Sequence, residues 1–323
     1  MRIAHINNTA NVAWRLAAAQ RRMGHEVVVC SLYETPFEFP CDVRIAGAEG
    51  PIGFNKAMFS RRKYLSGFDV LHIHGGIWKA QVFYPWLKFR FPEIVIAVHY
   101  HGSETRTGKG LHHRYCIDVS FHSTPDLADR LRNSVWVPNP VDLPDQYPEP
   151  NNALPRFVHF VSSGVHKGTD AVIKIFRRTF GDVRTAVEGP ITTMVAEEAE
   201  LWVVSKVPHR EALRIMGACD GVIDQVSSFG SYGVVAVEAM ALGKPVFCTI
   251  NRSMFPGCPI IPIQDGVDAE LRAVSDDPSY RRRIGRAGRE YVAKVHDSHK
   301  VANAVVAAYA PRALFRRSGT VGA

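Results

Sequence analysis

The feature that most constrains the fold is an alternation of strand-like and helix-like segments that stops at a linker and then starts again. In the first half, short apolar runs typical of buried strands are separated by segments of helical period. Strands that alternate with helices pair in parallel through helical crossovers, which is the architecture of an α/β domain. The strands expected in this half are 2–6, 27–31, 70–74, 94–98, 118–122 and 135–137, and the clearest helix is 12–23.

The linker is the segment LPDQYPEPNNALP at 143–155, which is rich in proline, asparagine and acid. Beyond it the pattern resumes, and 323 residues exceed the size at which one core usually keeps growing. We therefore predict an α/β protein of two doubly wound Rossmann-like domains, facing across a cleft, with ligands beyond the carboxyl ends of the strands. The expected elements are strands at 157–161, 201–204, 221–224 and 246–250, helices at 169–179, 210–219 and around Glu238, and a basic helical region at 277–309. The predicted bounds are 1–145 for the first domain, 146–310 for the second and 311–323 for a basic tail.

Composition and cysteine placement indicate a globular protein of a reducing compartment. No uninterrupted apolar run reaches the length of about 18 residues that predicts a transmembrane helix. The N-terminal sequence MRIAHINNTA enters a strand directly and lacks the features of a signal peptide. The six cysteines form no CxxC pair, and several lie in apolar segments, as is typical of reduced, buried thiols. We expect a cytoplasmic protein.

The net charge of +8 is unevenly spread, because basic residues interleave with aromatics between residues 55 and 92. This pattern supports two interpretations. The segment is a surface that contacts an anionic membrane, at its inner face, or an anionic lipid-linked acceptor. Alternatively, the aromatics belong to the core and the charges form a solvated face.

Residues 227–247, SSFGSYGVVAVEAMALGKPVF, indicate a phosphate-binding element. A glycine-rich turn leads directly into a helix, so the unpaired N–H groups at the start of that helix can approach an anion closely. Glu238 follows about one turn later among apolar neighbours, where an ionised carboxylate requires a partner. A nucleotide sugar offers phosphates and hydroxyls side by side and fits both features.

The run GSYGVVAVEAMALGKPV resembles the signature of the retaining glycosyltransferases of family 4, which have the GT-B fold. Other segments are similar to that family in the expected order, among them RRMGHEVVV, DVLHIHGG, VHYHGSETR, VPNPVD, HKGTDAVIKIF and VPHREALRIMGACDGVID. The resemblance spans residues 1 to about 310. It implies that the second domain binds a nucleotide sugar and the first an acceptor. It also implies transfer with retention of anomeric configuration, without a metal or another cofactor.

The resemblance assigns three catalytic residues. Lys167 would neutralise the diphosphate leaving group, Glu238 would bind the nucleotide ribose, and His101 would face the donor sugar near its reacting carbon. His99 lies two residues before His101 on the same strand face, so the choice between them stays open. The donor-binding residues expected from the motifs are Ser162, Ser163, Gly168, Gln225, Gly230, Ser231, Tyr232, Gly233 and Val234.

The sequence departs from the family at two positions. Ser162 stands where the family often has an arginine, and Gly230 stands where many members have the first of two paired glutamates. The transferred sugar would then be held either by backbone N–H groups of residues 231–233 or by Asp224 and Gln225. These departures keep a catalytically silent nucleotide-sugar-binding protein among the candidate functions.

His72 and His74 alternate along one strand face, as a pair of metal ligands would. No third ligand has convincing spacing in the sequence, and we predict no metal site.

Three functions follow from these features. The first is a glycosyltransferase that acts on a glycan or lipid-linked acceptor, the second is a sugar-nucleotide epimerase of the same fold, and the third is the silent binding protein. A dehydrogenase is disfavoured because the first loop, NNTANVAW, lacks the GxGxxG fingerprint. We expect no nucleic-acid partner.

Overall fold

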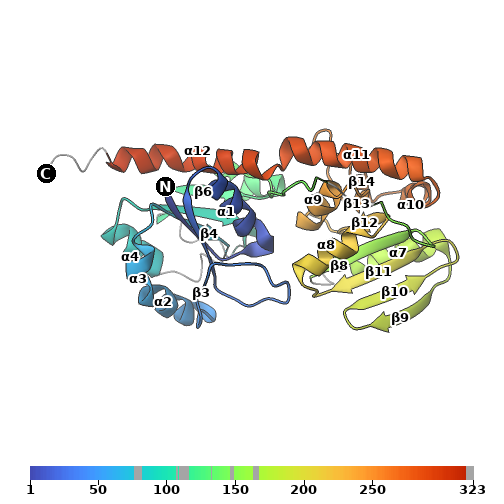
Figure 1. Cartoon of the computed structure of the whole chain (residues 1–323), viewed down its shortest axis with the longest axis horizontal. Coiled ribbons are helices and arrows are strands. Elements are labelled where there is room, and N and C mark those ends of the chain that lie inside the picture. The colour runs from blue at the N-terminus through green and yellow to red at the C-terminus, as the bar shows by residue number, and fades with distance from the viewer. Residues whose placement is uncertain are drawn as a thin grey trace. The chain divides into compact units, whose positions relative to one another are not determined.

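The computed structural model describes residues 1–75, 82–106, 108, 116–131, 133–145, 149–162 and 167–317 (Figure 1). The chain forms two compact units. The first contains Met1–Thr35, Phe39–Pro140 and the residues from Ser298 onward, and the second contains Pro36–Glu38 and Val141–Asp297.

The first unit is built on a parallel sheet of seven strands in the order β3-β2-β1-β4-β5-β6-β7. The strands are β1 (Arg2–Ile6), β2 (Glu26–Ser31), β3 (Val43–Arg44), β4 (Val70–His74), β5 (Val95–Tyr100), β6 (Val119–His122) and β7 (Val135–Trp136). The order reverses between β1 and β4, so a doubly wound sheet has its topological switch point there.

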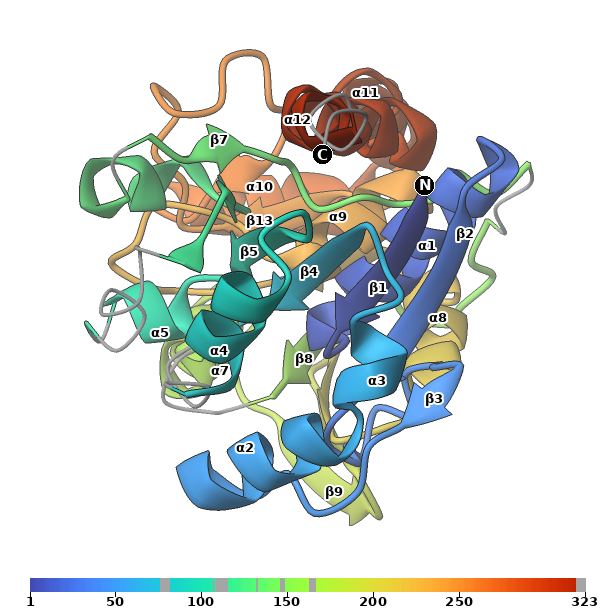
Figure 2. The same cartoon turned by 90° about the vertical axis from the view of Figure 1, so that its left-hand side faces the viewer.

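Helices cover both faces of this sheet, α2, α3 and α4 one face and α1 the other (Figure 2). On the first face Ile73 and its apolar neighbours pack against residues such as Phe54, Leu65 and Phe83. Because side chains alternate along a strand, His72 and His74 project from the opposite face. The helices are η1 (Thr9–Asn11), α1 (Val12–Arg22), α2 (Gly50–Ser60), α3 (Arg62–Leu65), α4 (Phe83–Arg90), α5 (Ser103–Arg106), η4 (Pro125–Arg130) and α12 (Ser298–Arg317).

The structure divides the chain differently from the predicted bounds at its C-terminal end. The segment from Ser298 was assigned to the second domain or the tail, whereas α12 packs on α1 and β5 of the first unit. The hydroxyl of the fully buried Tyr309 forms a hydrogen bond with Nδ1 of His72 on β4. The expected helical region 277–309 is accordingly two helices. The first ends just before residue 296, and the second begins just after residue 297.

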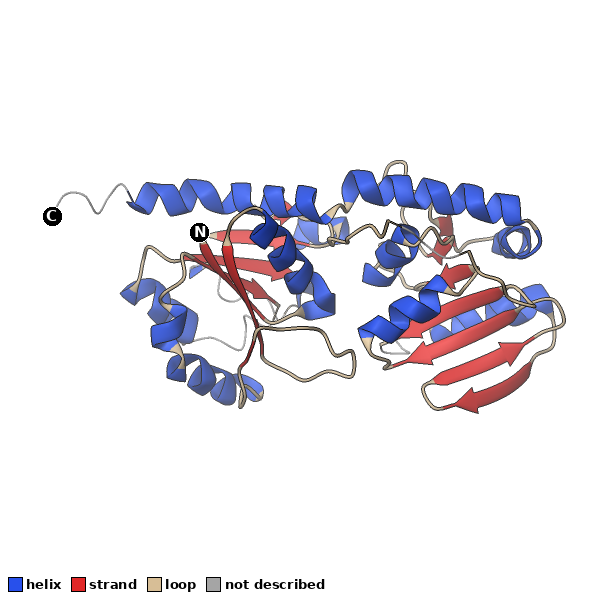
Figure 3. Cartoon of the chain, in the orientation of Figure 1, coloured by secondary structure: helices blue, strands red, loops and turns tan. Residues whose placement is uncertain are grey.

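The second unit contains a mixed sheet of seven strands in the order β14-β13-β12-β8-β11-β10-β9 (Figure 3). Its parallel strands are β8 (Arg156–Val161), β11 (Glu200–Ser205), β12 (Gly221–Ile223), β13 (Val246–Cys248) and β14 (Ile261–Pro262). The prediction of a parallel sheet in this domain is corrected here, because β10 (Ile191–Val195) runs antiparallel to both of its neighbours, β9 (Arg184–Glu188) and β11. Only Gly189 and Pro190 connect β9 to β10, and a two-residue connection forms a hairpin, whereas a parallel crossover needs a dozen residues or more.

Two apolar layers cover this sheet. One contains α8 (His209–Gly217), α9 (Val234–Ala241) and α11 (Pro278–Val295), and the other contains α7 (Thr169–Phe180) and α10 (Val267–Asp276). The side chain of Asp277 caps α11 by accepting hydrogen bonds from the backbone N–H groups of Ser279 and Tyr280, at 2.7 and 3.1 Å. With two α/β sheets covered by helices, the predicted fold class of two doubly wound domains is confirmed.

The aromatic residues of the basic segment 55–92 divide between core and surface. Phe83 and Tyr84 are fully buried, and Phe59 packs on Phe83 and Trp86. Phe89, by contrast, is 88% exposed. Trp78 and Lys79 lie outside the described residues. Within the described part of the chain, no helix has the length and apolar character needed to cross a membrane.

Candidate functional site

The second unit has its topological switch point between β8 and β12. The helix that follows β8, α7, lies on one face of the sheet, and the helix that follows β12, α9, lies on the other. The chain therefore leaves the carboxyl ends of these two strands toward opposite faces of the sheet, and open α/β sheets bind ligands at such switch points. Ser162, Lys167, Asp224 and Gln225 all lie in or at the ends of the two loops that follow these strands.

Lys167 and Asp224 form a buried ion pair at this point. The side chain of Asp224 is fully buried and that of Lys167 is 13% exposed. The second carboxylate oxygen of Asp224 accepts a hydrogen bond of 3.1 Å from the backbone N–H of Gly233, which precedes α9. One carboxylate therefore fixes the ammonium group of Lys167 beside the start of the helix that carries Glu238.

Gly168 allows this close approach. Its φ of +66° is a conformation that L side chains rarely adopt, and a Cβ at this position would collide with the backbone oxygen of Val226. The Val226 N–H donates to the Lys167 carbonyl at 3.1 Å, which joins the two loops directly. In this structure the glycine at position 168 is explained by contact with the neighbouring loop.

His159 supports the same junction and was not singled out from the sequence. Its Nδ1 is 2.8 Å from the carbonyl oxygen of Ile223, and its Nε2 is 3.1 Å from the hydroxyl of Thr169. Since a carbonyl only accepts, Nδ1 carries the proton and Nε2 accepts from Thr169. Burial lowers the pKa of His159, which keeps the ring neutral and fixed between β8, β12 and α7.

The turn before α9 has a backbone that explains the absence of a glutamate at position 230. Gly230 has a φ of +62°, and a Cβ there would lie 3.0 Å from the Cβ of Asn251. Its carbonyl accepts a hydrogen bond of 2.8 Å from the Asn251 N–H. A side chain at this position would be strained as well as crowded.

The remaining residues predicted to bind the donor have different surroundings. The side chain of Gln225 donates to the carbonyl of Ser231 and so stabilises the turn. The hydroxyl of Tyr232 points into the core, where it lies 3.1 Å from the hydroxyl of Tyr291 and 2.9 Å from Nε2 of His296. Ser162 is exposed directly after β8, Val234 is the first residue of α9, and Ser163 lies outside the described residues.

Glu238 is buried, with 4% of its side chain exposed, and has the partner that its apolar surroundings require. Its Oε1 lies 2.7 Å from Nε2 of His209, the first residue of α8. The segment VPHREAL contained this histidine, but nothing in its spacing related it to Glu238. A ligand hydroxyl at Glu238 would thus join an existing pair rather than meet an isolated carboxylate.

In the first unit, His101 is part of a chain of hydrogen-bonded side chains. Its Nε2 lies 3.1 Å from Nδ1 of His74, and its Nδ1 lies 2.8 Å from the hydroxyl of Ser123. Both ring nitrogens are therefore engaged, and burial lowers the pKa of His101 to about 3. His99 is completely buried whereas His101 is half-buried, so of these two rings only His101 has surface to offer a ligand.

No family model matches the sequence, and neither does any curated protein sequence. Among solved structures, HepE from Anabaena in complex with UDP-glucose superimposes with a TM-score of 0.70 at 13% identity, over 96% of this chain and all of HepE. The N-terminal domain of trehalose-6-phosphate phosphatase from Candida albicans gives a TM-score of 0.66 at 10% identity, over 96% of each chain. S. aureus TarM gives 0.52 at 11% identity, over 74% of this chain and 55% of TarM.

Similarity at these identities defines the fold. Together with the two covered sheets, it shows that this chain has a fold of the GT-B type, as the sequence predicted.

Proposed function

We propose that the protein is a glycosyltransferase that moves a sugar from a nucleotide-sugar donor to a glycan or lipid-linked acceptor. The observation that carries the proposal is the placement of Lys167 beside the start of α9, one helical turn before the buried Glu238. This arrangement offers a cation and unpaired backbone N–H groups for a diphosphate, and a carboxylate for a ribose.

The proposed chemistry is stabilisation of the leaving group. As the bond to the anomeric carbon breaks, charge develops on the diphosphate, and the Lys167 ammonium and the N-terminal N–H groups of α9 lower the energy of that charge. Asp224 orients Lys167 through their ion pair. No carboxylate is assigned as a nucleophile, so we propose a front-face reaction in which the leaving phosphate takes the acceptor proton and the anomeric configuration is retained. The reaction needs neither a metal nor another cofactor.

We propose a uridine nucleotide as the first donor to test. HepE was solved with UDP-glucose and with UDP, and TarM with UDP. Thermal-shift measurements with UDP-, GDP- and ADP-sugars should show a rise in Tm for the true donor, because a ligand that binds only the folded state stabilises it by mass action. If no nucleotide sugar raises the Tm, the proposal is wrong.

Turnover then separates the remaining functions. A transferase consumes the donor and glycosylates an added acceptor, while an epimerase converts the donor into its isomer without any acceptor. Binding without either reaction supports a catalytically silent nucleotide-sugar-binding protein. The observation that favours this function is the glycine at position 230, where a glutamate would contact the sugar. Product analysis by nuclear magnetic resonance of the anomeric proton tests retention directly.

On the acceptor side, we propose contact with an anionic lipid surface at the cytoplasmic face of a membrane. Ile52 of α2 and Phe89 of α4 are 87% and 88% exposed, and the exposed basic residues Lys56, Arg62 and Arg90 lie on the same three helices, α2 to α4. Helices that carry both exposed apolar and exposed basic side chains fit an interfacial contact. More protein should pellet with anionic liposomes than with neutral ones, and the amount should fall in an Ile52→Ser/Phe89→Ser variant. Equal and negligible pelleting with both kinds of liposome contradicts the proposed membrane contact.

A further inference from the structure

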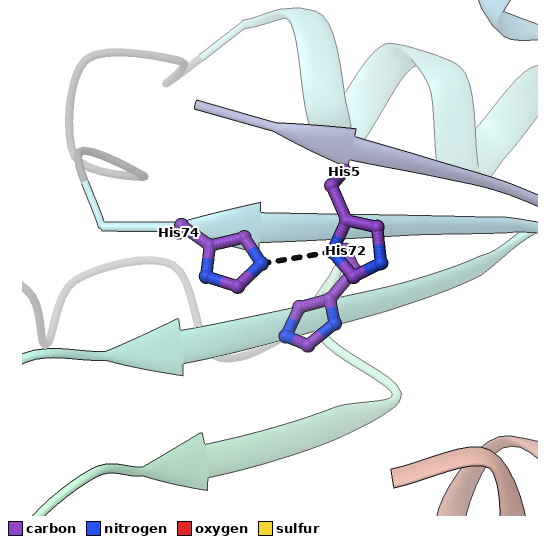
Figure 4. A group of neighbouring side chains, drawn as sticks. All are labelled: His5, His72 and His74. Atoms are coloured by element: carbon purple, nitrogen blue, oxygen red, sulfur yellow. Dashed lines mark hydrogen bonds between the residues drawn. The ribbon is translucent and has the colours of Figure 1, made fainter. Parts of the chain in front are cut away.

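The first unit brings His5 together with His72 and His74, which lie far from it in the sequence. His5 on β1 and His72 on β4 are register partners in the parallel sheet, and His74 follows two residues later on the same face (Figure 4). The sequence contained the pair on β4 but gave no spacing for a third ligand. The register of β1 against β4 supplies it.

The three rings are close enough to share one ion. One ring nitrogen from each histidine lies within 4.8 Å of those of the other two, and Nδ1 of His5 is 2.9 Å from Nε2 of His74. A tetrahedral zinc ion about 2.0–2.1 Å from each nitrogen requires the nitrogens to be about 3.4 Å apart. The separation between Nδ1 of His5 and Nε2 of His74 is about 0.5 Å shorter than this value, and the upper limit of 4.8 Å for the group lies above it.

The outward nitrogens of the three rings are already fixed. Nε2 of His5 is 2.8 Å from Oε1 of Gln20 on α1, Nδ1 of His72 is 2.6 Å from the hydroxyl of Tyr309 on α12, and Nδ1 of His74 meets His101 at 3.1 Å. Metal-bound histidines almost always have such a partner on the second nitrogen, which sets the tautomer and aims the first nitrogen at the metal.

His72 gives a second, independent observation. Its side chain is completely buried, and its Nε2 has no hydrogen-bond partner among the described residues. A buried polar atom without a partner destabilises a protein, so such atoms call for an explanation. A ligand at Nε2 provides one.

We propose that His5, His72 and His74 bind one divalent transition-metal ion of the zinc class. Three imidazoles without a carboxylate suit zinc, copper or nickel better than calcium or magnesium, which prefer oxygen ligands. The ligands are His5 Nδ1, His72 Nε2 and His74 Nε2, and the fourth position is left for water.

Binding replaces the hydrogen bond between His5 and His74 with bonds to the ion, moves the two nitrogens apart by about 0.5 Å, and rearranges protons along the chain of side chains. Without the ion, Gln20 accepts from Nε2 of His5, so Nδ1 of His5 accepts from Nε2 of His74. With the ion, the His74 proton resides on Nδ1 and is donated to Nε2 of His101, whose own proton moves to Nδ1 and is donated to Ser123. The hydroxyl of Ser123 can then donate to the Tyr100 carbonyl, 3.3 Å away. No proton leaves the protein.

The site is tested on the full chain without a histidine tag, stripped with a chelator and then dialysed against Zn²⁺ or Co²⁺. We expect one ion per chain by elemental analysis, a visible spectrum typical of tetrahedral Co²⁺, and a Tm that Zn²⁺ raises. His72→Gln should lose binding at least tenfold. The matched control is His122→Gln, because His122 is another buried histidine of the same sheet and belongs to neither of the possible ligand groups among the described residues.

Two further variants keep the test decisive. Tyr309→Phe retains the ring but removes the outward partner of His72, and affinity should fall by about 10–100-fold even if His72→Gln does not fold. His99→Gln tests whether the ion binds instead to the second possible ligand group, His74, His99 and His101, which shares His74 with the proposed site. The proposal is overturned if the wild-type chain retains no metal, if Tyr309→Phe and His72→Gln bind as the wild type does, or if His99→Gln loses binding while His5→Gln keeps it.

Discussion

The ammonium group of Lys167 is paired with the carboxylate of Asp224, and that carboxylate also accepts a hydrogen bond from the backbone N–H of Gly233. A single buried acid thus joins the loop after β8 to the start of α9. The glycine-rich turn that the sequence predicted to bind phosphate and the separate lysine loop are therefore connected directly in the structure.

Removal of the Lys167 charge should impair transfer. For Lys167→Met we expect a loss of at least about 2 kcal/mol in transition-state stabilisation, roughly 30-fold in kcat/KM, because one charge-stabilising group is lost. Steady-state kinetics with the donor found by thermal shift measure the effect. Lys174→Met, an exposed lysine of α7, is the control. An unchanged kcat/KM in folded Lys167→Met would exclude this lysine from the mechanism.

The same substitution should destabilise the second unit, since it leaves the buried Asp224 without its cation. Loss of one partner from a buried pair costs about 3–5 kcal/mol. Adding Asp224→Asn should recover part of the loss, because the amide oxygen still accepts from Gly233 but no buried charge remains. Urea denaturation of the single and double variants measures this. If the double variant is less stable than Lys167→Met, the pair does not contribute in the way described.

Glu238→Gln should weaken nucleotide binding. A hydrogen bond to a charged group contributes about 1.5–3 kcal/mol, so the Kd for the nucleotide should rise roughly 10- to 100-fold. Isothermal titration calorimetry measures the Kd. Glu211→Gln on α8 is a suitable control, because Glu211 is paired with Arg214 at the surface. Equal affinity in Glu238→Gln and Glu211→Gln would remove Glu238 from the nucleotide site.

Introduction of a glutamate at position 230 should not raise activity. We expect Gly230→Glu and Gly230→Ala each to lower the free energy of unfolding by roughly 1–2 kcal/mol, because the φ of +62° disfavours any L side chain. Gly257→Ala separates the effect of the positive φ from the effect of crowding by Asn251. Gly257 also has a positive φ, but no atom lies within 4 Å of a Cβ added there. A stable, more active Gly230→Glu would show that the turn adapts to a side chain.

Buried histidines should make the protein less stable in mild acid. Burial lowers the pKa of His159 in the folded state below its usual value of 6.5. Below about pH 6.5 the unfolded chain therefore binds a proton that the folded chain excludes, and the free energy of unfolding falls by up to about 1.4 kcal/mol per pH unit for each such group. The loss continues until the pH reaches the lowered folded pKa.

Urea denaturation between pH 5 and 7 tests this dependence, with His159→Gln as the comparison. Below about pH 6.5, the free energy of unfolding should fall less steeply with pH in the variant than in the wild type. Above that pH, the two proteins should show the same pH dependence. Identical slopes in acid would mean that His159 is protonated in the folded protein.

Local patterns predicted much of the fold. Apolar runs identified β1, β4, β5 and β8, which are buried strands with dense apolar sequence. The hairpin β9–β10 was missed because β9 is exposed along its whole length and has no apolar run to reveal it. The position of α12 was missed because helical periodicity gives the apolar face of a helix but not the unit on which it packs.

The candidate site was also predicted only where neighbouring residues in the sequence define it. The glycine-rich turn, Lys167 and Glu238 were predicted from adjacent residues, and the buried environment of Glu238 correctly indicated a need for a partner. The partners themselves, Asp224 for Lys167 and His209 for Glu238, lie 57 and 29 residues away. Such pairs depend on the sheet order and on the register between strands, which a local pattern does not contain.

The hydrogen bond between His72 and Tyr309 spans 237 residues and joins β4 to α12. During synthesis, the first unit therefore emerges long before the helix that covers its histidine-bearing face. Domains usually fold as they are made, from the N-terminus onward. Here the second unit can complete its sheet first, and the first unit stays unfinished until α12 has been synthesised. A premature stop before Ser298 would thus damage the N-terminal unit while leaving the C-terminal unit complete in sequence.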